Sequence, residues 1–492
     1  MSALADSPVL SIPGLRGGLY TDPATLDAFA DDFGHIVHHT PVAVLKPAAL
    51  EDVANAVGFC RRHGIEVTMR GQGHSTSGQS QVQCGLVIDS STLNAIERVG
   101  DFQVQVQAGI TWKDLLAKIV PLGLHPPVLT GLSALSVGGT LSMGGIGDAS
   151  FRHGAQVHNV LELEVVTGEG ELLRCSLEEN ATLFNAVLGG IGQYGLIVRA
   201  TIPTVPVLPK TRRYVIPYVD PNAWFAAMHR LTSGGQVDGL YTRLLPPWSP
   251  QNPTGAKWVY ALNASKFFEP SRPPSDADII LTPLNQPPQA VQVTDSGTFD
   301  FDVSVDESLA QLDAAGFVNV RHVWGDLFLP ATQTLSFVLD TLPTLVPADL
   351  GPGGFVLVFP VRNLFPRAPA FRLPTEENVF LFDVLTADAP KDANPANFVS
   401  TEMPAARARF EAARAIGGTL YPIGSTPMSK DDWAQQYGQE YESLERLKDL
   451  YDPAHILTPG PAIFNPDRKT PQVLGGATSA SGPMTSGLTR RP

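Results

Sequence analysis

Two glycine-rich segments constrain what this chain can fold into. Residues 70–75 read RGQGHS, and residues 137–147 read VGGTLSMGGIG. Because glycine has no side chain, the backbone can approach a ligand closely there, and successive N–H groups can surround a pyrophosphate. We predict that each segment is a loop that follows a strand. His74, inside the first loop, adds a nucleophilic side chain to this arrangement.

The residues around these segments indicate a mixture of short strands and helices. Apolar residues at helical spacing predict a helix between Pro47 and Gly64, flanked by strands at 42–47 and 65–69. Alternation and turn signals predict four further elements: a strand at 102–108, a hairpin of 160–166 with 171–175, a helix at 181–188 and a strand at 196–201.

A third glycine motif, GIGQYG at 190–195, matches the G-x-G-x-x-G pattern of nicotinamide-binding Rossmann folds in letters only. That fold needs a strand before the motif, a helix after it and an acidic residue about 20 residues further on. Here a predicted helix precedes the motif and a strand follows, and Asp220 is the first acidic residue after Thr201. We interpret the motif as a tight helix-to-strand turn, in which the backbone passes close to another element or to a flat ligand.

Composition limits the class of protein. The chain has 492 residues, of which 43% are hydrophobic and 17% are charged, so it can bury a large core. A formal net charge of −14 argues against nucleic acid or an anionic membrane as a partner. No apolar run approaches the roughly 20 residues that span a bilayer. The first residues lack a secretion-signal pattern, and Cys60, Cys84 and Cys175 lack metal-ligand spacing, so we expect a cytoplasmic protein whose cysteines are core residues.

The character of the chain changes near residue 205. Prolines between Pro203 and Pro221 suggest a linker, and residues 222–420 read as a second domain whose proline-rich loops shape a pocket. Residues 430–450 predict one amphipathic, charged helix. A tail rich in Gly, Ser, Thr and Pro follows, and we predict that it is disordered.

Several segments together resemble a known family. The chain is similar to flavoproteins of the vanillyl-alcohol oxidase type, with an FAD-binding domain of the PCMH type, and within them to the cytokinin dehydrogenases. The resemblance covers nearly the whole chain from Thr21 to Phe464 and is looser over 206–420. Its most specific segments are 41–47 (PVAVLKP), 70–79 (RGQGHSTSGQ), 137–147, 151–176, 183–200, 377–385 (ENVFLFDVL) and 451–464 (YDPAHILTPGPAIF).

The resemblance implies an α+β fold made of a two-part FAD-binding domain and an inserted α+β cap domain that binds substrate. Residues 1–205 would form the N-terminal part of the FAD domain, and residues 422–466 its C-terminal part. Residues 206–421 would form the cap, and residues 467–492 the disordered tail. This division agrees with the change in composition near residue 205.

The resemblance also implies how FAD is held. His74 matches the histidine that carries FAD covalently, through a ring nitrogen bonded to the flavin 8α carbon. No cysteine lies within 126–137, so the second attachment that some relatives have is not expected. The other matching cofactor positions are Gln72, Gly73, Ser75, Gln79, Ser136, Gly139, Ser142, Ile146, Ile197, Tyr421 and Thr458.

The chain departs from the family where substrate chemistry takes place. Gly131 stands where cytokinin dehydrogenases have the aspartate that accepts a proton from the substrate nitrogen, and glycine cannot act as a base. Met143 replaces an asparagine, and Pro461 replaces a glutamine. Asp148 is a candidate base by its position, with two weaker candidates in the cap region, Asp238 and Tyr241.

Other conspicuous residues have simpler structural interpretations. We expect Arg152 and His153 to fix a loop through hydrogen bonds. Trp112 and Trp324 read as core residues, with the alternative that Trp324 faces the pocket.

The function that follows is an FAD-dependent oxidoreductase. It would take hydride from a C–H next to N or O of a small organic substrate, with O₂ or another acceptor to reoxidise the flavin. Two alternatives remain open: a true cytokinin dehydrogenase, which removes an N6 side chain oxidatively, and a flavin-binding protein without catalysis.

Overall fold

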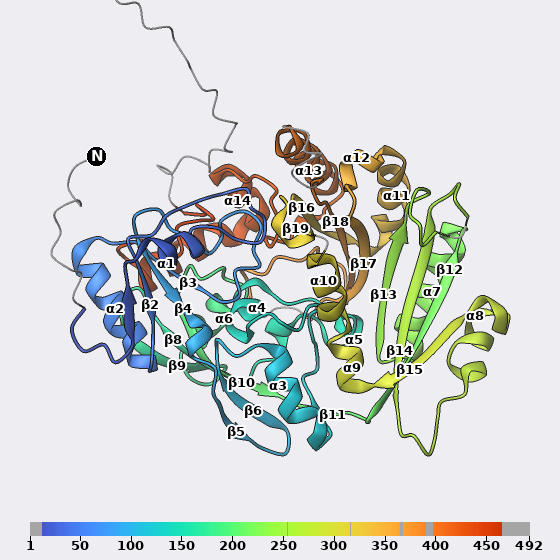
Figure 1. The fold of residues 1–492 in the computed structure, drawn as a ribbon, viewed down its shortest axis with the longest axis horizontal. Coiled ribbons are helices and arrows are strands. Elements are labelled where there is room, and N and C mark those ends of the chain that lie inside the picture. Colours follow the sequence, from blue (N-terminus) through green and yellow to red (C-terminus); the bar gives the residue numbers. More distant parts are fainter. Residues whose placement is uncertain (1–11, 253, 315, 365–367, 390–396, 465–492) are drawn as a thin grey trace, which may run out of the picture.

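The computed structural model describes residues 12–252, 254–314, 316–364, 368–389 and 397–464. Within them, strands form a four-stranded, a five-stranded, an eight-stranded and a two-stranded sheet. The first half of the chain lies beside the eight-stranded sheet, and the C-terminal helices return to the first half (Figure 1). The mixed α/β architecture that the sequence predicts is confirmed.

The four-stranded sheet has the order β1 (Gly18–Tyr20), β2 (Ala43–Lys46), β4 (Leu86–Asp89), β3 (Val67–Arg70). Strands β2, β4 and β3 are parallel, and β1 is antiparallel to β2. Helix α2 (Leu50–His63) connects β2 to β3 and ends at Gly64, whose φ of +63° favours glycine. The predicted β-α-β unit is therefore confirmed, with β4 placed between its two strands.

The five-stranded sheet is antiparallel. Its order is β5 (Ile96–Val99), β6 (Gln103–Gln107), β10 (Leu196–Pro203), β8 (Glu162–Val166), β9 (Leu172–Ser176). Helix α3 (Trp112–Ile119) begins at Thr111, whose side chain accepts a hydrogen bond from the Asp114 N–H. Helix α6 (Ala181–Val187) leads through residues 188–195 into β10, so the GIGQYG motif is the helix-to-strand turn that the sequence predicts.

The second glycine-rich segment differs from its prediction as a loop after a strand. Val137–Met143 form helix α4, only residues 144–147 continue as a loop, and residues 126–136 contain no strand. Val137, Thr140 and Leu141 are buried at helical spacing, and this packing outweighs the low helix propensity of glycine. Gly138 is needed because a Cβ there would lie 2.6 Å from the Ala108 Cβ.

The eight-stranded sheet is also antiparallel. Its order is β15 (Gln292–Gly297), β12 (Lys210–Tyr218), β14 (Val259–Phe268), β13 (Gly239–Leu245), β17 (Phe355–Arg362), β18 (Asn378–Leu385), β16 (Trp324–Pro330), β19 (Thr419–Leu420). The predicted linker after Pro203 is therefore wrong, because most of it is strand β12. Pro217 fits in β12 because the pairing with β15 ends at Val215, so its missing N–H costs no ladder bond on that side.

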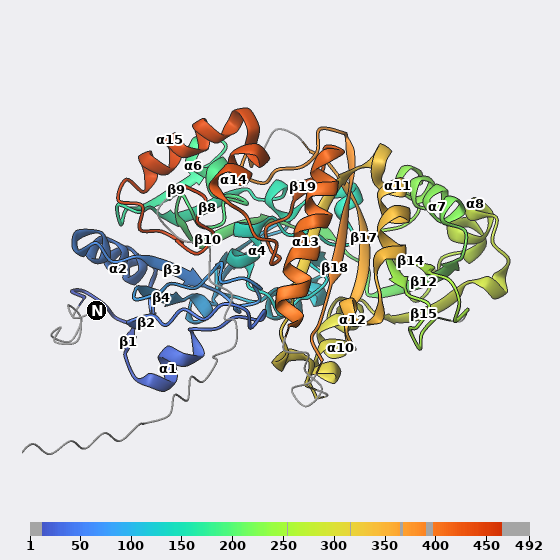
Figure 2. The same ribbon diagram turned by 90° about the horizontal axis from the view of Figure 1, so that it is seen from above.

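Helices cover one face of this sheet. Helices α7 (Pro221–Gly234), α11 (Ala331–Thr341) and α13 (Phe398–Ala415) contact its strands and lie along the same face (Figure 2). Because side chains alternate along a strand, every second residue points to the opposite face, which borders the cavity described below. The shorter elements are α1 (Pro23–Ala28), β7 (Leu124–His125) paired with β11 (Val205–Pro206), α5 (Ser150–His153), α8 (Thr282–Leu284), α9 (Thr298–Asp302), α10 (Ser304–Asp313) and α12 (Pro347–Leu350).

The C-terminal helix is broken into two, in contrast to the single helix that the sequence predicts. Helices α14 (Lys430–Tyr437) and α15 (Tyr441–Tyr451) meet at Gly438, whose φ of +56° ends the first helix. Helix α15 contacts α6 of the N-terminal half, and the two lie side by side in Figure 2. The break keeps Trp433, Tyr437 and Tyr441 buried although the two helices differ in direction.

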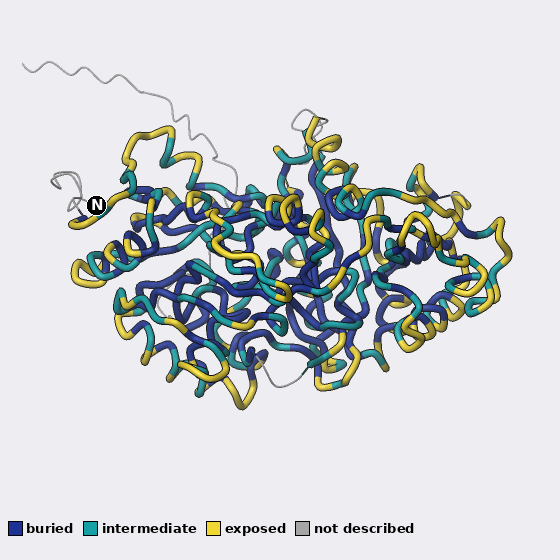
Figure 3. Tube along the Cα trace, turned by 90° about the horizontal axis from the view of Figure 1, so that it is seen from below, coloured by how far each residue is buried: buried dark blue, intermediate teal, exposed yellow. Residues whose placement is uncertain are grey.

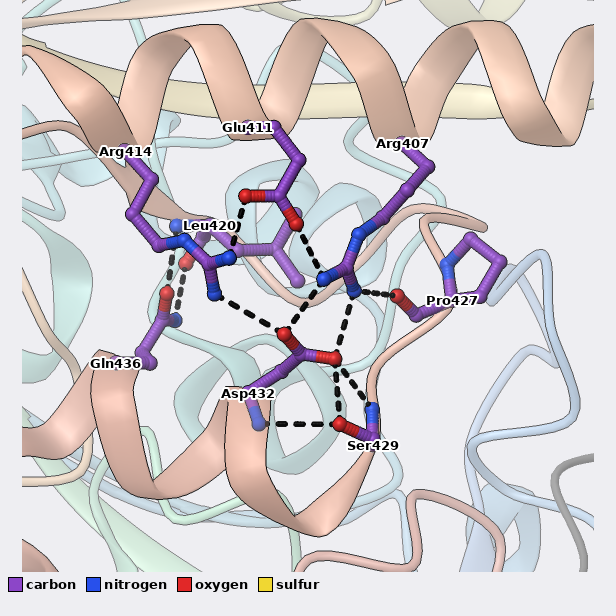
Figure 4. A network of polar contacts seen from close by, with 8 residues as sticks. All are labelled: Arg407, Glu411, Arg414, Leu420, Pro427, Ser429, Asp432 and Gln436. Atoms are coloured by element: carbon purple, nitrogen blue, oxygen red, sulfur yellow. Dashed lines mark hydrogen bonds and ion pairs between the residues drawn. The ribbon is translucent and has the colours of Figure 1, made fainter.

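A charged network joins α14 to α13 (Figure 4). The Asp432 carboxylate accepts hydrogen bonds from Arg407 at 2.6 and 2.7 Å and from Arg414 at 3.0 Å. These guanidinium contacts, together with hydrogen bonds from Ser429, hold the pKa of Asp432 well below its usual range. Gln436 adds two hydrogen bonds to the backbone of Leu420 in β19. Helix α14 is therefore fixed to the eight-stranded sheet and its covering helix.

The hydrophobic core is continuous across the chain's halves. One buried cluster contains residues of the five-stranded sheet, the eight-stranded sheet and the two C-terminal helices. Figure 3 shows buried chain running through the interior of the molecule, with exposed residues mostly in the outer loops and helices. A second cluster surrounds the four-stranded sheet and includes Ile456 and Leu457. Cys60 and Cys175 are buried as expected, whereas Cys84 is exposed, so that part of the prediction is wrong.

Two predictions on organisation stay as predictions. The strands of the four- and five-stranded sheets end by Pro203, and the first strand of the eight-stranded sheet begins at Lys210. The domain boundaries at residues 205 and 421 stay predictions. The tail 467–492 lies outside the described residues. No helix in the described part of the chain is long and apolar enough to span a bilayer.

Candidate active site

A cavity of about 880 Å³ lies where the N-terminal half, the eight-stranded sheet and the C-terminal segment meet. Every residue that the sequence analysis assigns to the cofactor lines it, although these residues come from segments far apart in the sequence. They are Gln72, Gly73, His74, Ser75, Gln79, Ser136, Gly139, Ser142, Ile146, Ile197, Tyr421 and Thr458. Asp148, Asp238, Tyr241 and Gly131 line the same cavity.

His74 follows β3 and lies among aromatic rings. Its ring centroid is 4.1 Å from that of Phe33 and 5.6 Å from that of Trp324. Burial, together with the nearby His322, lowers the pKa of His74 to about 4, so the imidazole is neutral at pH 7. Within the described residues its ring nitrogens make no hydrogen bond, so a nitrogen lone pair is free toward the cavity.

Two charged residues hold the loop that carries His74. Asp32 accepts hydrogen bonds from the Gly78 N–H at 2.7 Å, the Gly34 N–H at 3.1 Å and the Ser75 hydroxyl at 3.2 Å. Burial raises the pKa of Asp32 to about 7. Arg70 donates to the backbone carbonyl of Asp31. The loop is thus fixed on the side away from the cavity.

The two glycine-rich segments touch each other. A Cβ on Gly71 would lie 2.0 Å from Ser136 Oγ, and a Cβ on Gly73 would lie 2.2 Å from the Arg70 guanidinium. Gly73 also has a φ of +67°, which favours glycine. The glycines are therefore required for the close approach of the loop to the start of α4.

Two of the predicted cofactor side chains also make hydrogen bonds within the protein. The Gln79 amide donates to the Gly424 carbonyl at 2.8 Å, and its oxygen accepts from the Ser77 N–H at 2.9 Å. The Ser142 hydroxyl donates to the Gly138 carbonyl at 2.8 Å. Both residues border the cavity, so Gln79 positions the loop, and Ser142 presents an oxygen that can still accept a hydrogen bond.

The C-terminal residues reach the cavity through contacts with the N-terminal half. The Tyr421 hydroxyl accepts from the Gly145 N–H at 3.1 Å, which joins β19 to the end of the second glycine-rich segment. Thr458 donates its N–H to the Val67 carbonyl at 2.8 Å and accepts from the Gln193 side chain at 2.7 Å. These contacts place the GIGQYG turn against the LTPG segment.

Lys448, which the sequence analysis missed, holds two of the segments that line the cavity. Its buried ammonium donates to the Gln193 and Leu457 carbonyls at 2.9 and 3.1 Å and pairs with Asp452 at 2.8 Å. It therefore holds both segments that carry Thr458 and the turn. The sequence offered only the spacing of Lys448 and Asp452 on one helix face, which usually marks a solvated pair.

Asp148 lies beside a buried ion pair that was not predicted. His125 Nε2 is 3.2 Å from Asp302 Oδ2, and His125 Nδ1 is 2.7 Å from the Pro126 carbonyl. Because both ring nitrogens face oxygen acceptors, the arrangement favours the imidazolium; burial opposes the cation, but Asp302 raises the pKa of His125. Burial and the Asp302 carboxylate raise the pKa of Asp148 to about 7. All three side chains border the cavity.

Two positions that depart from the family pattern, Gly131 and Met143, line the cavity. Gly131 is exposed to the cavity, and a Cβ added there would meet nothing within 4 Å. A Cβ on Gly147 would lie 1.7 Å from the Leu129 carbonyl, so the segment with Asp148 packs against the segment with Gly131. Asp148 and Gly131 therefore lie on adjacent segments of the cavity wall.

Trp324 does not occupy the core position that the sequence analysis preferred. It lines the cavity, which matches the alternative and not the preferred core assignment, whereas Trp112 is buried and donates to Thr140 Oγ1 at 2.9 Å. Arg152 binds the Asp238 carboxylate at 3.3 Å and the Val237 carbonyl at 2.5 Å, so it fixes a loop as expected.

The cavity fits FAD in its chemistry. The exposed Gly139 backbone and the close-packed glycines leave room for phosphates, and apolar residues such as Ile146 and Ile197 suit a flat ring system. Trp324, which lines the cavity beside His74, adds an aromatic surface. These features define the class: a protein with a buried site for a large, phosphate-bearing, aromatic cofactor.

Comparisons with known proteins agree. Residues 41–176 match the family model of an FAD binding domain, and residues 249–464 match the model described as "Cytokinin dehydrogenase 1, FAD and cytokinin binding". The chain is 32% identical to an "Uncharacterized oxidoreductase ORF5 in fasciation locus" of Rhodococcoides fascians, over 91% of this chain and 99% of that one. It is 30% identical to cytokinin dehydrogenase 2 of Arabidopsis thaliana, over 91% and 93%, and 31% identical to cytokinin dehydrogenase 5 of rice (Oryza sativa subsp. japonica), over 94% of each.

The chain thus belongs to the family of cytokinin dehydrogenase-like, FAD-linked oxidoreductases. Its cofactor is FAD, and it is an oxidase or dehydrogenase with an FAD-binding domain and a second domain of the cytokinin-binding type.

Proposed function

We propose that this protein carries FAD covalently on His74 and oxidises a small organic substrate at a C–H next to N or O. O₂ or another acceptor takes up the electrons. The observation that carries the proposal is the convergence of residues from 72–79, 136–148, 197, 421 and 458 on one cavity. When bound, FAD supplies a two-electron acceptor for the hydride.

His74 suits covalent attachment because it is neutral and its ring nitrogens make no hydrogen bond to the described residues. A protonated imidazole would have no lone pair to offer the flavin 8α carbon. The lowered pKa of about 4 keeps the ring neutral at pH 7. Phe33 and Trp324 restrict the ring's orientation. None of the three cysteines lines the cavity, which supports attachment through His74 alone.

Asp148 is the proposed base. Oxidation of an amine or alcohol carbon by hydride loss requires removal of the N–H or O–H proton, and a carboxylate with a pKa near 7 suits that task. The His125–Asp302 pair lies next to it, and its imidazolium opposes the rise in the pKa of Asp148. The base would thus stand beside Gly131, the position at which the resemblance expects a carboxylate.

Cytokinin oxidation is the competing substrate assignment. The match of residues 249–464 to a cytokinin-binding model favours it. Gly131 argues against it, because the resemblance places the base for that reaction at this position. An amine, alcohol or hemiacetal other than a cytokinin therefore fits better.

The attachment is tested by denaturing the purified protein and filtering it. We expect the flavin colour to stay with the polypeptide, and His74→Ala to release it or never to bind it. His63→Ala, on the exposed end of α2, is the matched control. An anaerobic screen of amines, alcohols and sugars, followed by bleaching of the flavin band, tests catalysis. Bleaching by no substrate class, with flavin bound, would leave the non-catalytic flavoprotein as the correct reading.

A further inference from the structure

We propose that the cavity recognises an anionic group of the substrate, a carboxylate, through Arg243 and Arg213. This inference rests on the proposed function, since it names a substrate class for the same site. Both residues lie on the eight-stranded sheet, on the face opposite the covering helices, and both line the cavity.

The alternation of strand β13 places Arg243 there. Thr242 and Leu244 are buried on the side of α7, where Thr242 Oγ1 accepts a hydrogen bond from the Trp224 indole at 2.8 Å. Tyr241 and Arg243 therefore point the other way, into the cavity. In the neighbouring strand β17, Leu357 pairs with Arg243, so an apolar side chain lies directly beside the guanidinium.

No carboxylate in the described part of the chain pairs with the guanidinium of Arg243. Among the described residues it makes no ion pair and no side-chain hydrogen bond, and its buried Nε has no partner. Its guanidinium carbon lies 5.1 Å from the centroid of the Phe355 ring. Stacking on a ring uses the face of a guanidinium and leaves the N–H donors in its plane free, which suits a carboxylate.

Arg213, on β12, adds a second positive charge. It donates to the side-chain oxygen Oδ1 of Asn263 at 2.6 and 3.0 Å and to the Tyr241 hydroxyl at 3.4 Å. Both partners are neutral, so these contacts orient the side chain without cancelling its charge. Arg213 is exposed, so the charge pair runs from the solvent side into the cavity.

Other charges in the cavity are already balanced. Asp238 is shared by Arg152 and Lys266, and Asp302 faces His125. Asp383 is held protonated, because burial and the adjacent Asp326 raise its pKa. Burial and the nearby Arg213 lower the pKa of Arg243, and a bound anion would relieve both effects. Asp148, whose carboxyl group lies over Gly239 of β13, is the exception: burial raises its pKa to about 7. One carboxylate against two guanidinium groups still leaves a net positive charge for a ligand.

The rest of this wall defines the body of the substrate. Phe355, Leu357 and Phe359 of β17 line the cavity, and the Tyr241 ring stacks on Phe359 with centroids 5.4 Å apart. An apolar wall beside two arginines fits an aromatic or aliphatic carboxylic acid that also carries the oxidisable C–H. A neutral adenine derivative would leave both guanidinium groups unpaired.

Calorimetric titration of the flavin-loaded protein tests this without requiring turnover. The probes are benzoate, phenylacetate and 3-phenylpropionate, each paired with its neutral amide. We expect at least one acid to bind about ten- to a hundredfold more tightly than its amide, as for loss of charge-assisted hydrogen bonds. Arg243→Gln should remove that preference, and Arg243→Lys should restore part of it. Arg446→Gln, on the exposed face of α15, removes the same charge and should change nothing.

Equal affinity of acids and amides across the panel, or an acid preference that survives both Arg243→Gln and Arg213→Gln, would overturn the proposal. If circular dichroism shows that Arg243→Gln does not fold, Arg213→Gln, at an exposed position, is tested in its place. Its preference for acids over amides should then be lost, and a preserved preference would overturn the proposal. Parallel measurement of anaerobic flavin reduction separates this inference from the proposed function. If acids bind but no substrate reduces the flavin, the result supports the anion site and contradicts the proposed oxidation of a small organic substrate.

Discussion

Asp326 on β16 and Asp383 on β18 stand directly opposite each other in an antiparallel pair, and both are buried. Both oxygens of Asp326, and Oδ1 of Asp383, are buried without a hydrogen-bond partner among the described residues. Burial raises the pKa of both, and the neighbouring carboxyl raises that of Asp383 further. Asp383 also borders the cavity. The pair therefore still holds protons at pH values at which exposed aspartates are ionised.

This pair predicts how stability depends on pH. Above the ordinary value of 3.8 the unfolded chain has lost these protons, while the folded protein still holds them. The folded state thus binds more protons, and the free energy of unfolding should fall as pH rises from about 4 toward the raised pKa values. Asp326→Asn should flatten this slope, as measured by urea unfolding at several pH values. An equal or steeper slope in the variant would contradict the protonated pair.

The sequence predicted local elements well where pattern and turn chemistry agreed. Helix α2 has apolar residues at helical spacing and Gly64 in its end cap, and the hairpin of β8 and β9 has a turn between two apolar runs. The motif resemblance also named residues that meet in one cavity although they lie up to hundreds of positions apart. Spacing alone could not have placed Thr458 beside Gln193.

The misses have physical causes. Helix α4 was taken for a loop because glycine is a poor helix former, and only the contact of Gly138 with Ala108 explains its place. The pairing of His125 with Asp302 and the free Arg243 were missed because they depend on tertiary contacts between strands and helices far apart in the chain. Gly438 broke a helix whose charges alone suggested continuity.

Gly131→Asp should raise activity on a cytokinin. A carboxylate has room there, because an added Cβ meets nothing within 4 Å, and a general base typically contributes about 10²–10⁴-fold. We expect little oxidation of isopentenyladenine by the natural chain and a clear gain in the variant, measured as the rate of anaerobic flavin bleaching. Gly131→Asn, similar in size but not basic, is the matched control. Rapid oxidation by the natural chain would show that another base serves this substrate.

Asp148→Asn should change the pH profile as well as the rate. Because the carboxylate is the active form and its pKa is about 7, activity should rise with pH through this value. The variant should lose that rise and about 10²–10⁴-fold in kcat/KM, measured on a substrate found in the anaerobic screen. Asp238→Asn is the comparison, since Asp238 is already paired with Arg152 and Lys266. If the pH profile of activity is unchanged in Asp148→Asn, another group removes the substrate proton.

Ending the chain at Thr426 should abolish flavin retention, although both glycine-rich segments remain. The truncation removes Thr458 and Lys448, and with Lys448 the contacts that hold the Gln193 carbonyl. It also removes the buried side chains of Trp433, Tyr437, Tyr441 and Leu444. Each such side chain contributes about 1.5–3 kcal/mol, against a total stability of about 5–15 kcal/mol for a domain.

A chain ending at Phe464 keeps these residues and should retain flavin as the full chain does. Absorbance of the denatured, filtered protein measures retention in both. A soluble, folded 1–426 fragment with flavin still attached would exclude residues 427–464 from the cofactor domain.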